Sequence, residues 1–317
     1  MKFDLDEQQR DFAASIDAAM AAADLPTAVR AWADGDTSPG RKVWARLADL
    51  GVTALAVPER FGGLDAHPVD LVVALERLGR WCVPGPVAES VAVAPVLLAD
   101  DDRLAALAAG ELIATVAMPP TMPRAVDSGA AGVTLLARDG GVADATPGAP
   151  HASVDPSRTL YDVTVCGDAK PADLARAYEF GALATAAQLV GAGQALLTAA
   201  VDYAKQRTQF GRAIGSYQAI KHKLADVHIA VELARPLLYG AALSLADGSA
   251  DTARDVSAAK VAAADAALLA ARSALQAHGA IGFTAEYDLS LWLLRVQALR
   301  SAWGDPAAHR RRVLAAL

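Results

Sequence analysis

The segment RTQFGRAIGSYQ, residues 207–218, carries side chains suited to holding an anion between two stretches of helical pattern. An arginine such as Arg207 binds a pyrophosphate through two parallel hydrogen bonds. Gln218 adds a neutral donor beside the free N–H groups that open the next helix, and Phe210 offers an apolar face to a ring. The same residues fit an ordinary connecting loop, in which Gly211 and Gly215 permit turns. Local chemistry leaves both interpretations open.

Helices must position this segment, because most of the chain has helical character. Of its 317 residues, 54% are hydrophobic and 21% are charged. That balance allows a sizeable core and argues against disorder. Alanine is abundant and aromatic residues make up only 5%, a composition that favours helices. The length fits one large domain or two to three small ones.

Charge and cysteine content exclude several classes of function. The net charge of −7 argues against a nucleic-acid partner, because phosphate backbones need a dense basic patch. One or two local cations are enough for a phosphate-bearing cofactor. Cys82 and Cys166 lack metal-ligand spacing, so we expect neither a disulfide framework nor a metal site. The N-terminus has charges where a signal peptide is apolar, and no uninterrupted apolar stretch of about 18 residues predicts a membrane span. We expect a soluble, cytoplasmic protein.

Three regions of the chain differ in residue composition and pattern. Residues 1–112 are predicted to be helical; apolar residues recur at helical spacing from Phe3 to Ile16, and Asp4 is placed to cap this first helix. Residues 113–167 contain three short segments with strand character, ELIATVAMPP, GVTLLARDGG and YDVTVCG, bounded by Gly, Pro and Asp. These segments predict a small sheet that must pack on the helices to be stable.

Residues 168–317 return to a helical pattern. Three long helices and a shorter fourth, joined by brief connections, predict a four-helix bundle. Pro236 predicts a kink or break in the second helix. The third is expected to begin near Asp251 or Thr252 and to stop at Gly279. The expected fold is therefore mainly α, with an N-terminal helical domain, a reduced β middle region and a C-terminal helical bundle.

Three motifs resemble those of the acyl-CoA dehydrogenases. RTQFGRAIGSYQAIKHKLADV resembles their C-terminal signature. LADLGVTALAVPERFGGLDAHPVDLVVALERLGR is similar to their N-terminal helical domain, in which a P-E-x-x-G-G loop precedes a helix ending in E-x-L-G. LQAHGAIGFTAEYDLSLWLLR resembles their last helical segment, built on Q-x-x-G-G-x-G-Y/F-x-x-E-Y. The motifs occur in the family's order, and with the helix–sheet–helix layout the resemblance extends over nearly the whole chain.

The resemblance implies an FAD site between subunits. In this family, the R-x-x-F-G arginine, the glutamine of the next helix and the Q-x-x-G-G motif meet the pyrophosphate and adenine side of a neighbouring subunit's FAD. The corresponding residues here are Arg207, Phe210, Gln218, Gln276 and Gly279. The second glycine of Q-x-x-G-G is replaced by Ala280, which places a methyl group where the family's backbone approaches the cofactor. His278 is interpreted as a residue of the helix C-terminus, with catalysis as the less favoured alternative.

The resemblance also implies a base that this sequence lacks. Acyl-CoA dehydrogenation needs a carboxylate in contact with the α-proton of the thioester, and the family commonly supplies it from a Y-E-G-T run. Here that stretch is RSAWGDPAAHRRR, with Trp303 or Gly304 at the glutamate position and the shorter Asp305 nearby. The family's second base position corresponds to Gly181. Glu179 is two residues away, about 200° around a helix, so it is a weak candidate and is expected to be a solvated surface charge.

The middle region shows a similar loss. The stretch TVAMPPTMPRAVDSGAAGVTLL lacks the T-E-x-x-x-G-S-D run that packs against the flavin ring in the family. The elements retained are those that the family donates to a neighbour's FAD, and the elements lost serve a subunit's own site. The sequence therefore resembles the shorter, β-type subunit of actinobacterial heterotetrameric acyl-CoA dehydrogenases, with two copies each of a longer and a shorter chain.

The resemblance then implies a flavoprotein oxidoreductase of lipid metabolism. It would dehydrogenate a CoA thioester as in β-oxidation, with steroid catabolism as the expected setting, and its partner would be a longer acyl-CoA dehydrogenase subunit. Two alternatives stay open. One is a self-sufficient homomeric enzyme whose base has moved to Glu179 or Asp305. The other is a non-enzymatic scaffold that binds CoA esters.

Overall fold

The computed structural model describes residues 4–317, and it begins with a block of short helices. The first of them is capped by Asp6, not by Asp4 as expected: the Asp6 carboxylate accepts from the Gln9 backbone N–H at 2.8 Å, and the Gln9 side chain accepts from the Asp6 N–H at 3.2 Å. This reciprocal pair is a capping box. Phe3 lies outside the described residues. The helices of this block are α1 (Glu7–Ala21), α2 (Leu25–Ala33), α3 (Ser38–Asp49), α4 (Pro68–Arg80), the π-helical turn η3 (Glu89–Val93), α5 (Ala94–Leu98) and α6 (Arg103–Ala108), with short 3₁₀ turns η1 (Val52–Ala54) and η2 (Glu59–Phe61).

A six-stranded sheet follows, larger than the three predicted segments suggested. Its strands are β1 (Ala114–Ala117), β2 (Ala125–Val126), β3 (Val133–Arg138), β4 (Gly141–His151), β5 (Leu160–Val165) and β6 (Lys170–Pro171). The strand order is β1-β3-β4-β5-β2, with β6 paired to β4. Only the β1–β3 pairing is parallel. The three predicted segments became β1, β3 and β5.

The C-terminal half forms the predicted bundle and adds a fifth helix. Its elements are α7 (Leu174–Gln206), the strands β7 (Thr208–Gln209) and β8 (Arg212–Ala213), the 3₁₀ turn η4 (Ile214–Ser216), α8 (Gln218–Ala246), α9 (Thr252–His278), the 3₁₀ turn η5 (Gly279–Phe283), α10 (Leu289–Ser301) and α11 (Pro306–Ala315). Pro236 was predicted to kink or break the helix; it lies inside α8 without ending it, so the break is wrong and the kink stays a prediction. The α9 bounds agree with the expected start at Asp251 or Thr252 and stop at Gly279.

Small residues bring the two halves of the molecule into close contact. A Cβ atom on Gly191 of α7 would lie 1.9 Å from the Glu76 carbonyl oxygen of α4, and one on Gly79 of α4 would lie 2.1 Å from the Gln188 carbonyl oxygen of α7. Only glycine permits this backbone-to-backbone approach. These contacts hold α7 against the N-terminal block. Helix α7 in turn positions residues of the candidate site.

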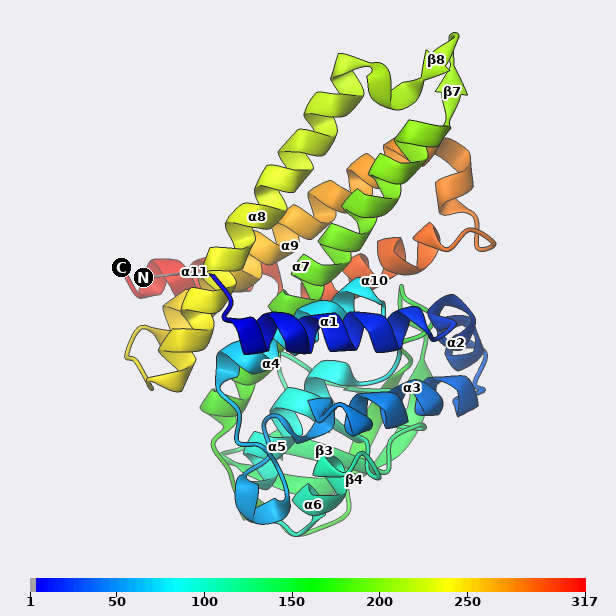
Figure 1. The fold of residues 1–317 in the computed structure, drawn as a ribbon. Coiled ribbons are helices and arrows are strands. Elements are labelled where there is room, and N and C mark those ends of the chain that lie inside the picture. Colours follow the sequence, from blue (N-terminus) through cyan, green and yellow to red (C-terminus); the bar gives the residue numbers. More distant parts are fainter. Residues whose placement is uncertain (1–3) are drawn as a thin grey trace.

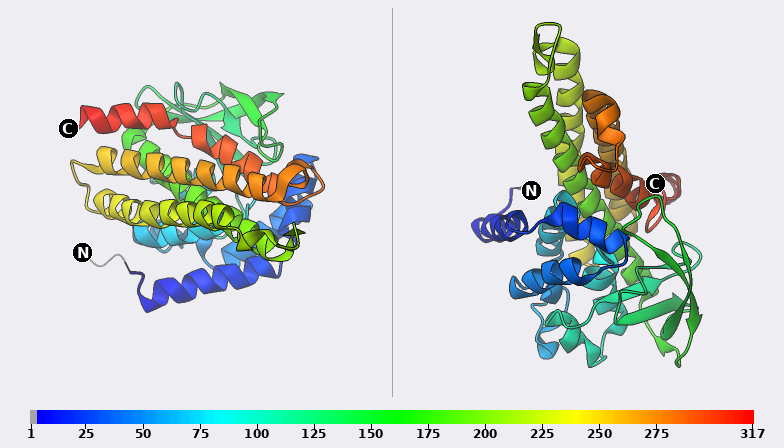
Figure 2. Two further views of the ribbon diagram at one scale, coloured as in Figure 1. Left: turned by 90° about the horizontal axis from the view of Figure 1, so that it is seen from above. Right: turned by 90° about the vertical axis from the view of Figure 1, so that its right-hand side faces the viewer.

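The bundle extends well beyond the rest of the molecule. In Figure 1, α7 and α8 run upward to the β7–β8 hairpin, while the sheet and α6 lie at the opposite end. The right-hand view of Figure 2 shows the N-terminal helices on one side of the lower part and the sheet on the other. The hairpin therefore projects from the molecule at the end farthest from the sheet.

Helices α7 and α8 are long and apolar enough to cross a membrane by length and composition only, a test that the core helix of a folded protein also passes. In α7, 89% of the most apolar 18-residue window is buried inside the protein, as in a core helix. In α8 only 39% of that window is buried. Helix α8 therefore presents an apolar face that the described residues leave uncovered.

Candidate functional site

Four of the five predicted cofactor-binding residues surround one hollow at the projecting end of the bundle. The hollow measures about 390 Å³ and lies between the end of α7, the hairpin, the start of α8 and the end of α9. It is lined by Tyr203, Arg207, Gln209, Phe210, Ile214, Tyr217, Ile220, Gln276, Ala277, His278 and Gly279. Gln218 is the first residue of α8, as expected, but does not line the hollow. Residues about 70 positions apart in the sequence thus converge on one place.

The hairpin holds Phe210 out into solvent. Phe210 and Gly211 both have positive φ, 52° and 80°, and they join the two-residue strands β7 and β8. Two residues of positive φ are the signature of the tight hairpin turn that matches strand twist. Tyr217 braces the turn, because its hydroxyl donates to the Gln209 carbonyl at 3.2 Å and its ring lies 4.0 Å from the Arg212 guanidinium. The Phe210 side chain is 93% exposed at the tip.

The hollow offers hydrogen-bond donors and positive charge. Within residues 4–317, Arg207 is exposed and forms no ion pair or side-chain hydrogen bond. The Gln276 amide oxygen accepts from the Lys223 ammonium group, so the Gln276 N–H₂ group is left as a donor. Gly279 has a φ of 69°, which suits glycine, whereas Ala280 lies outside the positive-φ region and its methyl group causes no backbone strain. One guanidinium, an amide donor and a glycine backbone line the hollow and fit an anionic ligand such as a pyrophosphate. Lys223 adds a positive charge beside Gln276.

The positions expected to hold a base are filled in a different way. Trp303 is fully buried, and its indole N–H donates to the Glu89 carboxylate at 2.9 Å. A Cβ atom on Gly181 would lie 2.3 Å from the indole ring. The Trp303 ring therefore lies directly on Gly181, so two of the positions that were compared with the family's base positions are packed against each other. Neither position presents a carboxylate.

The backbone around Trp303 is held firmly. Trp303 has a φ of 55° and Gly304 a φ of 98°, which make a sharp turn between α10 and α11. The Trp303 carbonyl accepts from the Tyr178 hydroxyl at 3.1 Å and lies 2.8 Å from His309 Nε2. His309 Nδ1 lies 3.1 Å from the Ser257 hydroxyl. Burial lowers the pKa of His309 to about 4, so near neutral pH the ring is neutral and Nε2–H donates to Trp303.

The two carboxylates considered as relocated bases have structural partners. The Glu179 carboxylate is buried and paired with Arg312 of α11, so the expectation of a solvated surface charge is wrong. The reason is that α11 packs against α9, which brings the Arg312 side chain to the start of α7. Asp305 is the N-cap of α11, accepting from the Ala308 N–H at 2.6 Å. Each carboxylate therefore stabilises the packing or start of α11.

Glu89 is a buried carboxylate that sequence reasoning missed. It lies on the π-helical turn η3 and is fully buried, and its Oε2 atom has no hydrogen-bond partner among the described residues. A π-helical turn is often found at functional sites. The signal in the sequence was a single acidic residue in the otherwise apolar stretch PGPVAESVAVAPVLL. In this chain Glu89 serves as the acceptor for Trp303.

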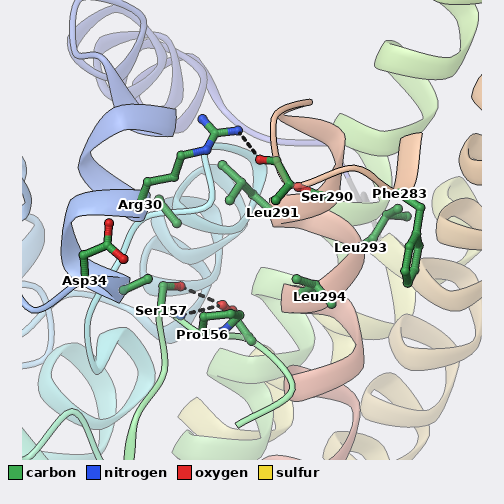
Figure 3. Close-up of a pocket in the computed structure, with 13 residues that line it drawn as sticks. Arg30, Asp34, Pro156, Ser157, Phe283, Ser290, Leu291, Leu293 and Leu294 are labelled. Atoms are coloured by element: carbon green, nitrogen blue, oxygen red, sulfur yellow. Dashed lines mark hydrogen bonds between the residues drawn. The ribbon is translucent and has the colours of Figure 1, made fainter. Parts of the chain in front are cut away.

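A second hollow, of about 330 Å³, lies between α2, the loop at residues 155–157 and α10 (Figure 3). Leu291 and Leu294 contribute to its apolar wall, and Arg30 donates to the Ala285 carbonyl at 3.2 Å across its rim. At its base, Asp155 is paired with the buried Arg295. Burial alone would raise the pKa of Asp155, but the charge and hydrogen bonds of Arg295 and Ser157 lower it. Sequence analysis did not predict this hollow.

Comparison with known proteins identifies the family. The acyl-CoA dehydrogenase N-terminal domain model matches residues 6–100, and the C-terminal domain model matches residues 174–317. The acyl-CoA dehydrogenase IpdE2 of Mycobacterium tuberculosis is 32% identical over 301 residues, covering 91% of this chain and 90% of the relative. These matches define an FAD-dependent oxidoreductase class. The chain belongs to the acyl-CoA dehydrogenase family.

Two solved structures whose names each join two proteins share the fold. The ChsE4-ChsE5 complex from Mycobacterium tuberculosis matches with a TM-score of 0.85 at 23% identity, covering 99% of this chain and 98% of that chain. A variant of the steroid ACAD Tcur3481-Tcur3483 matches with a TM-score of 0.86 at 22% identity, covering 98% of this chain and 97% of that chain. At this level of identity the likeness shows the fold.

Proposed function

We propose that this chain is the non-catalytic subunit of a heteromeric, FAD-dependent acyl-CoA dehydrogenase. It supplies contacts for the pyrophosphate and adenosine half of an FAD whose reacting ring lies on a longer partner subunit. The observation that carries the proposal is the contrast between two places on α7. The hollow around Arg207 is open and cationic, whereas the place expected for the base is filled by Trp303 on Gly181.

The length of α7 separates these two places. Gly181 lies near the start of this 33-residue helix and Arg207 caps its end. At 1.5 Å per residue the helix is about 50 Å long, and most of that length lies between the two residues. One dinucleotide cannot extend over that distance, so a cofactor bound at Arg207 has its reacting ring away from the Trp303 region of the same chain. The ring then lies against another chain.

Each residue of the hollow has a role that its chemistry supports. Arg207 holds the pyrophosphate, and the Gln276 N–H₂ group adds a hydrogen bond beside it. Gly279 lets the backbone approach the ligand. Phe210, exposed at the hairpin tip, packs against the partner and the cofactor there. When bound, FAD supplies the hydride acceptor for the β-carbon of the thioester.

The proton must leave the substrate through the partner's residues. An indole N–H is a donor and has no lone pair with which to take a proton. Glu179 and Asp305 are engaged with α11. We therefore assign the base to the longer subunit and expect this chain to orient the cofactor only. The ChsE4-ChsE5 complex supports a partner chain of the same family, and the steroid ACAD structure supports a steroid-derived thioester as substrate. We place the assembly in the cytoplasm.

Co-expression with a longer, co-encoded family member tests the proposal. The purified complex should contain one FAD per two chains, and this chain purified alone should contain none, as measured by flavin absorbance and protein mass. Arg207→Ala should lower FAD retention by about 10- to 100-fold, the loss expected for a charge-assisted pair of hydrogen bonds. Lys205→Ala is the matched control, since it removes the same charge two residues away on the exposed end of α7, outside the hollow.

The proposal fails if this chain alone binds stoichiometric FAD and oxidises an acyl-CoA. In that case Glu179→Gln and Asp305→Asn would identify which carboxylate acts as the base. A complex that stays colourless under every pairing would favour a scaffold function.

A further inference from the structure

His278 is the one imidazole that lines the hollow among the described residues, and the proposed function gives it no role. It is the last residue of α9 and is 5% exposed. Its ring is stacked 4.2 Å from the ring of Tyr203 and lies 5.4 Å from that of Tyr287, measured between centroids. The two tyrosines therefore fix the plane of the imidazole at the edge of the hollow.

Hydrogen bonding fixes the tautomer of His278. Its Nδ1 atom lies 2.8 Å from the Ala274 carbonyl oxygen. A carbonyl oxygen only accepts, so Nδ1 carries the proton and donates it. Burial also lowers the pKa of His278, which favours the neutral ring. The Nε2 atom is then left as a lone-pair acceptor.

That acceptor is unpaired. Within residues 4–317, His278 Nε2 is buried and has no hydrogen-bond partner. Buried polar atoms nearly always have one, and an exception calls for an explanation. A ligand in the hollow explains it, because His278 lines the same hollow as Arg207 and Gln276. The ligand must then present an N–H or O–H group to this residue.

The polar groups of the hollow differ in what they attract. Arg207 and the Gln276 N–H₂ group suit phosphate oxygens, which only accept hydrogen bonds. The Nε2 lone pair of His278 repels those oxygens. A ligand that satisfies both kinds of group combines an anion with a nearby donor. The adenosine half of a dinucleotide has this combination, since its pyrophosphate is attached to a ribose with hydroxyl groups and to an adenine with an amino group.

We propose that His278 Nε2 accepts a hydrogen bond from the adenosine half of the bound dinucleotide, either from a ribose hydroxyl or from the adenine amino group. The inference rests on the proposed function, because it places that dinucleotide in the hollow. His278 thereby selects the adenosine end of the ligand, whereas Arg207 binds the pyrophosphate without regard to what is attached to it.

The test measures flavin affinity of the purified complex by fluorescence quenching, without any turnover. The variant His278→Phe keeps an aromatic ring between the tyrosines and removes the acceptor, and His278→Gln restores an acceptor oxygen. His278→Phe should weaken FAD binding about 5- to 30-fold, or about 1–2 kcal/mol at 1.4 kcal/mol per tenfold change. His278→Gln should recover part of that loss.

Three ligands identify the donor. They are FAD, its analogue with a 2′,3′-dideoxyribose in the adenosine half, and its analogue with hypoxanthine in place of adenine. The parent complex should bind one analogue 5- to 30-fold more weakly than FAD, and the His278→Phe complex should not distinguish that analogue from FAD. The analogue affected tells whether a ribose hydroxyl or the amino group is the donor.

The outcomes separate this inference from the proposed function. If Arg207→Ala weakens FAD binding but His278→Phe does not, the inference is wrong and the proposed function stands. If neither variant weakens binding, both are wrong. If the His278→Phe variant fails to fold, the parent complex is sufficient for the test. Equal affinity of the parent complex for FAD and both analogues overturns the inference.

Discussion

At the scale of single residues, the contact between Trp303 and Gly181 determines what this chain can do. Trp303 is one of the two residues, with Gly304, expected at the position of the family's base, and among residues 4–317 its indole N–H donates only to Glu89. The absence of a side chain at residue 181 is what admits the ring. The two residues thus form a single packing unit, and each is expected to depend on the other.

We predict that Gly181→Ala destabilises the protein by about 1–3 kcal/mol, because a methyl group overpacks the Trp303 ring. Trp303→Ala alone should cost about 3–5 kcal/mol through the cavity it leaves. The double variant should cost less than the sum by about 0.5–3 kcal/mol, since the new methyl then has room. Urea denaturation of the four proteins gives this coupling energy.

Gly240→Ala provides a matched control on α8, where a Cβ atom would meet nothing within 4 Å. That change should be neutral or slightly stabilising, because alanine is the better helix former. Strict additivity of Gly181→Ala and Trp303→Ala would contradict the packing unit.

His309 makes stability dependent on pH. Burial lowers its pKa from about 6.5 to about 4 in the folded protein. Between these values the unfolded chain binds a proton that the folded chain does not, so the free energy of unfolding falls as the pH falls from 6.5 to 4. We predict a contribution of about 3 kcal/mol over that interval. Denaturation curves for the parent and His309→Gln at several pH values measure it.

Asp127 acts in the opposite direction, because burial raises its pKa to about 7. Its effect is common to the parent and the variant, so their difference isolates His309. Parallel pH profiles for the two proteins would show that His309 does not carry the dependence.

At the scale of elements, the features that could be predicted are those set by neighbouring residues in the sequence, and features set by distant contacts could not be predicted. The start and end of α9 were predicted because both are marked by residue type in the sequence: Asp251 is the N-cap residue and Gly279 the C-cap residue, although the Asp251 side chain accepts no capping hydrogen bond. Strand β4 was not predicted. Pro147 and Pro150 argue against a strand locally, and the pairing of β4 with β3 and β5 is a non-local contact. Pro236 was expected to kink or break α8, but the helix continues through it, because its packing on α7 and α9 overrides the local preference for a break.

The residues of the candidate site were likewise predictable only where a local sequence motif marks them. Arg207, Phe210, Gln276 and Gly279 were found through motifs, and the structure brings them to one hollow. The pairing of Glu179 with Arg312 was missed, because the packing of α11 on α9, which brings Arg312 to α7, is a tertiary contact with no local pattern. Contact of these residues with FAD stays a prediction.

Helix α8 carries a stripe of exposed apolar residues, which indicates an interface with another chain. Ile229, Leu233 and Leu237 are four residues apart, so they lie on one face, and they are 55%, 66% and 46% exposed. We predict that Leu233→Lys leaves the fold of the chain intact, as judged by circular dichroism, and shifts the complex to smaller species in light scattering. A buried lysine charge in the interface is costly to desolvate.

Ala14→Lys is the control for this experiment. It adds the same charge at an exposed position of another helix, α1, and should leave the assembly unchanged. A complex of Leu233→Lys with the parent's mass would show that the α8 stripe lies outside the interface.

At the scale of the whole molecule, the projecting bundle end explains why one chain can carry half of a site. The β7–β8 hairpin and the hollow lie at the end farthest from the sheet (Figure 1), so they reach a second chain without disturbing the core of the first. The interior near Trp303, by contrast, is closed. Binding of the cofactor and binding of the partner chain are then thermodynamically coupled.

We therefore predict that FAD and the partner chain strengthen each other's binding by the same factor. Thermodynamic linkage requires this reciprocity when a ligand contacts both chains. Titration of the two purified chains, with and without saturating FAD, should show association tightened about 5- to 150-fold by the cofactor, the range typical of such coupling. Arg207→Ala should reduce that factor toward one while leaving association without FAD unchanged. If FAD has no effect on association between the parent chains, the cofactor contacts only one of them, and a shared site is excluded.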